Sequence, residues 1–194
     1  DCAEIMIKDG TANRLELIRE SFSFDRLSKL CLKKDGVYVV IGGARRHGLS
    51  ALIAETLADL GAGTIVVIGR SKADEDFLAF SRSFKNTRVL VLQCDISCVG
   101  SIPEALEKEK LSNKQVRGVF HGAACFDGDK LFKGVSDEAF EATLKPKVNG
   151  SLALLATAQE VGWELDFMVY LSSVVVSLGN LGQVAYAGNF AGVC

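Results

Sequence analysis

A serine and a tyrosine thirteen residues apart, with a lysine upstream of both, are the residues best suited to chemistry in this chain. Ser173 closes an apolar run typical of a buried strand, and Tyr186 follows a glycine-rich loop at the expected start of a helix. A strand-end hydroxyl beside a phenol can hold a carbonyl between two donors, of which one polarises the oxygen and the other supplies a proton. A free phenol has a pKa of about 10, so a nearby cation such as Lys147 is needed to make it a usable acid. The three residues predict reduction of a carbonyl, and a surface tyrosine with a strand-capping serine is the alternative.

A strand, a glycine-rich turn and a helix precede these residues in the order that dinucleotide-binding folds require. The β-branched run 37–41 has the composition of a strand buried on both faces, and helical apolar spacing begins at Leu49. The residues expected to bind the cofactor here are Gly42, Gly43, Arg45, Arg46, Gly48 and Leu49. Glycines let the backbone approach a pyrophosphate, and the helix N-terminus offers it unpaired N–H groups.

Three later strand ends complete the predicted cofactor wall. The second strand ends at Gly69, Arg70 and Ser71. An acidic residue there would select a free 2′-hydroxyl, whereas a guanidinium suits a 2′-phosphate, so the expected cofactor is NADPH rather than NADH. A solvated arginine in a turn is the alternative. The remaining wall residues are Cys94, Asp95 and Ile96 after the third strand, and Gly122, Ala123 and Ala124 after the fourth. Asp95 could also be a helix cap. We expect His121 to be packed and hydrogen-bonded rather than catalytic, and we expect no metal site.

Together these segments resemble the ketoreductase domain of modular polyketide synthases and related fatty acid synthases, a branch of the short-chain dehydrogenase/reductases. The resemblance covers nearly the whole chain, through residues 35–43, 69–71, 94–96, 121–124, 145–150, 171–173 and 182–187. Lys147 discriminates this branch, because most members of the superfamily place the lysine four residues after the tyrosine, where this chain has Phe190. The resemblance implies reduction, with NADPH, of a β-ketoacyl thioester tethered to an acyl carrier protein. It also implies a cytoplasmic megasynthase whose other domains are partners, in polyketide or fatty acid biosynthesis.

The resemblance also implies a role for each residue of the site. Tyr186 donates the proton, and Ser173 holds the carbonyl oxygen. Lys147 lowers the pKa of the tyrosine and contacts the nicotinamide ribose, and Asn189 orders a water molecule. Synthase ketoreductases of one stereochemical type carry a tryptophan where this chain has Leu178, and the other type carries an acidic segment that the loop 126–129 loosely matches. We therefore expect the D-configured β-alcohol.

Two departures from the family pattern bear on activity. Arg46 stands where the family has a third glycine, and Ile41 where it has a threonine. A bulky side chain at position 46 crowds the pyrophosphate unless it turns outward or pairs with a phosphate. Asn189 comes three rather than four residues after the tyrosine, a difference of about 100° around a helix. A degenerate, non-catalytic domain with a structural or nucleotide-binding role therefore remains an alternative.

Composition and element order set the outer limits. The 194 residues are 48% hydrophobic with a net charge of −2, so neither a nucleic-acid surface nor a membrane surface is indicated. The six cysteines have no framework spacing and are expected to be free thiols. Strands are predicted near 37–42, 64–69, 88–93, 117–122 and 166–173, and helices near 49–61, 73–84, 99–109 and 136–160. This alternation predicts an α/β, Rossmann-like, doubly wound parallel sheet.

The chain is predicted to divide into two parts. Residues 1–34 resemble the tail of a preceding structural subdomain, with a last strand and turn at residues 4–10. Residues 35–194 are expected to form an NADPH-binding catalytic domain that is incomplete at its C-terminus, because the strands and lid that follow in the family are missing.

Overall fold

The computed structural model describes residues 5–14 and 32–191, and its internal contacts divide the chain into two units, 1–30 and 31–194. In the first unit, β1 (Ile5–Lys8) and β2 (Thr11–Arg14) form an antiparallel hairpin. Asp9 and Gly10 connect the strands with φ values of 52° and 75°. Positive φ at both central residues is the geometry of a tight hairpin turn, in which Asp-Gly is a favoured pair. The predicted strand and turn are therefore present, except that Glu4 lies outside the described residues.

The second unit contains a five-stranded parallel sheet in the order β5-β4-β3-β6-β7. The strands are β3 (Val37–Ile41), β4 (Thr64–Gly69), β5 (Arg88–Gln93), β6 (Val116–His121) and β7 (Phe167–Tyr170). The helices are α1 (Leu49–Asp59), α2 (Glu75–Ser83), α3 (Ser101–Lys108), α4 (Asp137–Leu144), α5 (Val148–Val161), α6 (Val175–Leu178) and α7 (Val184–Ala191). The chain runs outward from β3 in one direction through β4 and β5, then returns to its other side with β6 and β7. This confirms the predicted Rossmann-like doubly wound fold.

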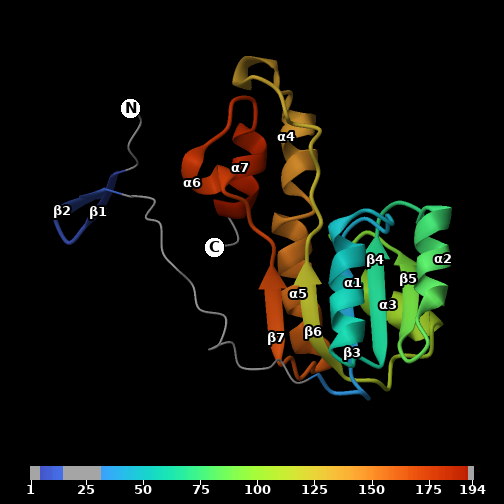
Figure 1. Ribbon diagram of the computed structural model, residues 1–194. Coiled ribbons are helices and arrows are strands. Elements are labelled where there is room, and N and C mark those ends of the chain that lie inside the picture. Colours follow the sequence, from blue (N-terminus) through green and yellow to red (C-terminus); the bar gives the residue numbers. More distant parts are fainter. Residues whose placement is uncertain (1–4, 15–31, 192–194) are drawn as a thin grey trace. The chain divides into compact units, whose positions relative to one another are not determined.

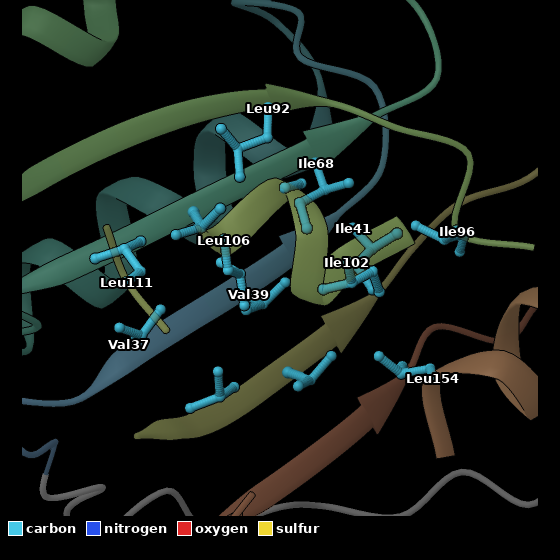
Figure 2. Close-up of a cluster of buried hydrophobic side chains, with 14 residues drawn as sticks. Val37, Val39, Ile41, Ile68, Leu92, Ile96, Ile102, Leu106, Leu111 and Leu154 are labelled. Atoms are coloured by element: carbon cyan, nitrogen blue, oxygen red, sulfur yellow. The ribbon is translucent and has the colours of Figure 1, made fainter. Parts of the chain in front are cut away.

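Two hydrophobic cores cover the two faces of the sheet. Alternate residues of β3 divide between them, because successive side chains of a strand point to opposite faces. Val37, Val39 and Ile41 join the core beneath α3 and α5, which Figure 2 shows. Tyr38 and Val40 join the core beneath α1 and α2. All five residues are buried, which explains why this run is apolar without interruption.

Two predicted elements differ from the structure. The helix expected over 136–160 is two helices, α4 and α5, separated at residues 145–147. Pro146 has no N–H to continue the hydrogen-bond ladder, and it places Lys147 at the N-cap of α5. The strand expected over 166–173 ends at Tyr170, because its neighbour β6 ends at His121. After one further bond, from the Leu171 N–H to the His121 carbonyl, Ser173 lies in a loop.

Candidate active site

The predicted site residues gather where the parallel strands end. In Figure 1 the arrows of the sheet point toward the end at which α4, α6 and α7 lie. The strand order reverses beside β3, and in open α/β sheets ligands bind in the crevice at such a point. Two hollows lie there, of about 170 and 190 Å³, and both are bordered by Ile41, Gly42, Gly43 and Arg45. The loop after β3 therefore stands between them.

The hollows contain nearly all of the predicted cofactor-binding residues. The first is lined by Gly69, Arg70, Ser71, Cys94, Asp95, Ile96, Ala123 and Ala124, together with Lys72, Lys145 and Pro146, which were not predicted. The second is lined by Gly48, Leu49 and Gly122, together with Ser50, Ile53 and Leu171, which were also not predicted. Only Lys147 in the segment 145–147 was assigned a role from the sequence. Lys145 is two residues away in the same run, and this proximity was the one signal that could have placed Lys145 at the first hollow.

Three glycines allow the strand ends to approach closely. A Cβ atom on Gly42 would lie 2.7 Å from the Ser50 hydroxyl, and one on Gly69 would lie 2.8 Å from the Gly42 carbonyl oxygen. A Cβ on Gly122 would lie 2.9 Å from the Leu171 side chain. Gly43 differs, because a Cβ atom there would have no described neighbour within 4 Å, and the residue borders both hollows. The backbone at Gly43 is therefore open to the hollows, so a pyrophosphate could approach it closely.

Arg46 is the one predicted cofactor-binding residue that lines neither hollow. Its guanidinium lies 4.2 Å from the centre of the Phe80 ring in α2, a cation–π contact. The side chain has therefore turned away from the glycine-rich loop. The missing third glycine does not close the cleft in this arrangement.

Asp95 lines the first hollow and also organises the turn that follows β5. Its Oδ1 accepts hydrogen bonds from the Ser97 hydroxyl at 2.6 Å and from the Ser97 N–H at 3.0 Å, and its Oδ2 lies 3.4 Å from the Lys145 ammonium. The Ser97 hydroxyl is the main cause that lowers the pKa of this carboxyl, with Lys145 contributing. The N-cap of α3 is Gly100 rather than Asp95, so the helix-cap alternative for Asp95 is wrong.

The charges around the first hollow suit an anion. Arg45, Arg70, Lys72 and Lys145 border it, against the single carboxylate of Asp95. Asp95 pairs with Lys145, and Arg70 forms no ion pair with any residue that the structure describes. Arg70 is exposed at the end of β4, with its backbone carbonyl held by the Gln93 side chain at 3.0 Å. An open backbone cradle beside unpaired cations fits a phosphorylated dinucleotide.

Lys147 is buried with little to balance its charge. Only 2% of the residue is exposed, and its ammonium donates to the His121 backbone carbonyl at 3.0 Å. It has no carboxylate partner in the described part of the chain. Burial lowers its pKa to about 8, because the charged form is disfavoured away from water. The neighbouring His121 ring is packed as predicted, and it is neutral at pH 7, since burial and the Lys147 charge lower its pKa to about 4. The hydrogen bond expected of this ring is absent, because neither ring nitrogen has a partner at hydrogen-bonding geometry among the described residues.

Tyr186 lies between two aromatic rings. The Phe126 ring, from the loop after β6, lies 5.0 Å from the tyrosine ring at a tilt of 33°. Phe190, one turn further along α7, lies 5.0 Å away and meets it edge-on at 85°. Phe190 also faces the Lys147 ammonium, at 5.2 Å from the ring centre. Contacts therefore connect Lys147 and Tyr186 through Phe190, a residue whose part in the site the sequence did not reveal.

No hydrogen bond, ion pair or ring contact joins Ser173 or Asn189 to that pair among residues 32–191. The Ser173 hydroxyl oxygen accepts a hydrogen bond of 3.3 Å from the Val175 N–H at the start of α6. This bond closes a local turn and caps neither β7 nor α6, whose N-cap is Val174, and it leaves the hydroxyl proton free to donate. Asn189 is fully buried, and neither atom of its amide has a hydrogen-bond partner in the described residues.

The comparisons with known proteins show the family of this chain. The KR domain family matches residues 36–191. The chain therefore belongs to the ketoreductase domains of polyketide synthases, in the short-chain dehydrogenase/reductase superfamily. It is 32% identical over 187 residues to the low-reducing polyketide synthase drtA of Aspergillus calidoustus, covering 95% of this chain and 8% of that protein. It is 36% identical over 161 residues to highly-reducing polyketide synthase 1 of Aureobasidium melanogenum, covering 80% of this chain and 7% of that protein.

Solved structures show the same fold. A ketoreductase domain from the bacillaene assembly line matches with a TM-score of 0.77 and 29% identity, covering 95% of this chain and 43% of that one. The ketoreductase chain thus spans under a tenth of the synthases it matches and under half of this solved domain.

Neither a metal cluster nor a membrane-spanning helix occurs among residues 5–14 and 32–191. No group of three or more His, Cys, Asp or Glu side chains there could hold a metal ion. No helix in these two ranges has the length and apolar character to cross a bilayer.

Proposed function

We propose that this ketoreductase domain reduces a β-ketoacyl thioester to the β-hydroxyacyl thioester, using NADPH, in polyketide biosynthesis. The observation that carries the proposal is that two features lie at the same end of the sheet: the hollows around the glycine-rich loop, and a tyrosine connected through Phe190 to a buried lysine. A role in fatty acid biosynthesis shares the same chemistry. NADPH would supply the hydride. The residues of this chain would bind the cofactor, orient the ketone and protonate its oxygen.

Each residue has a separate task in this mechanism. The open backbone at Gly43 would hold the pyrophosphate, and Arg70 with Ser71 would bind the 2′-phosphate through charge-assisted hydrogen bonds. Ser173 would donate a hydrogen bond from its hydroxyl to the ketone oxygen and keep its proton, which stabilises negative charge on that oxygen as it develops. Tyr186 would then give its proton to that oxygen. The Lys147 ammonium would favour release of this proton, because a nearby positive charge stabilises the phenolate.

The partners are part of the proposal. The relatives are multidomain synthases, which supports other synthase domains as neighbours of this one. We propose that the substrate arrives tethered to an acyl carrier protein in the cytoplasm. Cys94, Cys98 and Cys125 are free thiols, which supports a reducing compartment.

Tyr186→Phe tests the chemistry directly. The phenylalanine keeps the ring that packs between Phe126 and Phe190 but removes the proton donor. In the full-length protein, NADPH binding should survive while turnover of a β-ketoacyl thioester falls by about a hundredfold or more. Ser177→Ala, on α6, is a control that should leave turnover unchanged. Turnover of Tyr186→Phe near the parent rate would exclude the assigned role.

A non-catalytic, nucleotide-binding domain is the second candidate function. It is favoured by Asn189, whose buried amide forms no hydrogen bond with Tyr186, Lys147 or any other residue that the structure describes. Calorimetry with NADPH, combined with turnover of a β-ketoacyl thioester, separates the two candidates. Tight NADPH binding with no turnover in the full-length protein would support the non-catalytic function.

A further inference from the structure

Lys147 needs a source of stabilisation that its hydrogen bond alone does not supply. An ammonium has three N–H donors, and the described structure provides one acceptor, the His121 carbonyl. That carbonyl is shared, because it also accepts from the Leu171 N–H at 3.0 Å. A buried cation with neither a carboxylate nor a full set of acceptors is strongly driven to lose its proton.

The Phe190 ring provides the remaining interaction. Its centre lies 5.2 Å from the Lys147 Nζ, within the range of a cation–π contact, and the residue is only 3% exposed. The negative face of an aromatic ring favours the charged form of a lysine, and the effect is larger where water is excluded. The same ring meets Tyr186 edge-on at 5.0 Å. Residues four apart on a helix share a face, so Tyr186 holds Phe190 in place.

We propose that Phe190 is a positioning residue that keeps Lys147 protonated and directs its charge toward Tyr186. The neighbouring Asn189 does not provide this interaction, because its buried amide oxygen accepts no hydrogen bond from Lys147 or any other described residue. An aromatic ring can replace a polar group here because it stabilises a cation without needing water. The inference rests on the proposed function for its kinetic consequences, but not for the protonation state of Lys147.

Phe190→Leu tests the inference, because leucine keeps the apolar volume and removes the ring. The pKa of Lys147 is measured by NMR of the isotope-labelled lysine side chain, assigned by the loss of its signal in Lys147→Met. It should fall by about 0.5–1.5 below the parent value, as loss of a buried cation–π contact implies. In the active full-length protein, the alkaline limb of kcat/KM should move to lower pH by the same amount. Phe190→Tyr keeps the ring, so the pKa of Lys147 and the alkaline limb of kcat/KM should both stay at the parent values.

Phe126→Leu is the matched control, since it removes the other ring that contacts Tyr186. It should leave the pKa of Lys147 within about 0.2 of the parent value, because a cation–π contact does not reach beyond about 6 Å. If Phe190→Leu does not fold, Phe190→Met takes its place. An unchanged or raised pKa in the Phe190 variant would overturn the inference, as would an equal fall in the Phe126 variant. The pKa is read without substrate, so this result stands even if no ketone is reduced.

Discussion

At the scale of single residues, the site contains a lysine whose burial works against the stability of the fold. Lys147 is 2% exposed, and its pKa falls from the ordinary value of 10.5 to about 8. Removing a charge from water without a carboxylate partner destabilises the folded state. A fold that retains such a residue holds it for a purpose other than stability, which supports its assignment to the chemistry.

Lys147→Met should therefore stabilise the chain at pH 7. The fall in pKa from 10.5 to about 8 corresponds to roughly 3 kcal/mol, and the lost hydrogen bond and ring contact reduce the expected gain to about 1–3 kcal/mol. The His121 carbonyl keeps its bond from the Leu171 N–H. Urea denaturation of both proteins at pH 7 measures the difference.

The contribution of Lys147 to the free energy of unfolding should become more favourable as the pH rises. Between pH 8 and 10.5 the unfolded chain keeps a proton on Lys147 that the folded chain has lost, so this group makes stability rise with pH in that window. The gain from Lys147→Met should shrink across the same window, and it should nearly vanish at its upper end. A variant less stable than the parent at pH 7 would contradict this account.

Arg70 is the residue on which cofactor preference should depend. Its guanidinium is exposed at the first hollow and unpaired in the described structure, so it is free to bind a 2′-phosphate. Arg70→Ala should weaken NADPH binding by about 1.5–3 kcal/mol and leave NADH binding nearly unchanged. Titration calorimetry with both cofactors measures this, and Arg82→Ala, at the exposed end of α2, is the control. Equal losses for the two cofactors would exclude a 2′-phosphate site at Arg70.

At the scale of elements, the loop between β3 and α1 contains glycines with different surroundings. Gly42 and Gly69 are needed because neighbouring atoms lie under 3 Å from any Cβ they could carry. Gly43 has no such neighbour, yet it borders both hollows. Two adjacent glycines in one loop therefore have different functions: the first permits the fold, and the second permits a ligand to approach.

Gly43→Val should lower NADPH affinity by at least about tenfold without unfolding the protein. The new side chain enters open space, so the free energy of unfolding should change by less than about 1 kcal/mol, while the ligand meets a steric block. Gly69→Val is the matched comparison and should be strongly destabilising, because its Cβ would lie 2.8 Å from the backbone carbonyl oxygen of Gly42. Thermal denaturation and cofactor titration on both variants give the result. Unchanged NADPH affinity in Gly43→Val would place the pyrophosphate elsewhere.

At the scale of the whole molecule, segments far apart in the sequence surround Tyr186. The loop after β6 contributes Phe126, which contacts the tyrosine ring. The same loop is tied to the segment before α7, because the Gln183 amide donates to the Asp129 carboxylate at 2.7 Å. The acidic loop 126–129 therefore borders the proposed catalytic residue through Phe126, although Phe126 and Asp127 remain exposed to solvent. Its position is suited to controlling how a ketone lies against the cofactor.

The product should accordingly be the D-configured β-alcohol. Position 178 carries an exposed leucine at the end of α6 rather than a tryptophan, and the acidic loop is the feature that reaches Tyr186. Asp129→Asn keeps an acceptor for Gln183 and should retain the stereochemical outcome, whereas Asp129→Leu unties the loop and should lower the selectivity. Chiral chromatography of the product from the full-length protein measures both. A predominantly L-configured alcohol from the parent would refute the assignment.

The sequence alone determined the sheet, the glycine-rich loop and the location, at the strand ends, of most residues predicted to bind the cofactor. These features depend on local composition: β-branched runs such as 37–41 form strands buried on both faces, and glycines at strand ends permit close approach. The break between α4 and α5 was missed, although Pro146 was a local signal for it. The shorter β7 could not be predicted, since its end depends on where β6 stops.

Only the tertiary structure decided what the unusual residues of the site do. Arg46 leaves the cleft because Phe80, 34 positions further along the chain, offers its ring. Phe190 matters because α7 brings its ring to the ammonium of Lys147, at the start of a different helix. Contacts of this kind depend on how elements pack across the fold, and neither periodicity nor spacing within one element contains that information.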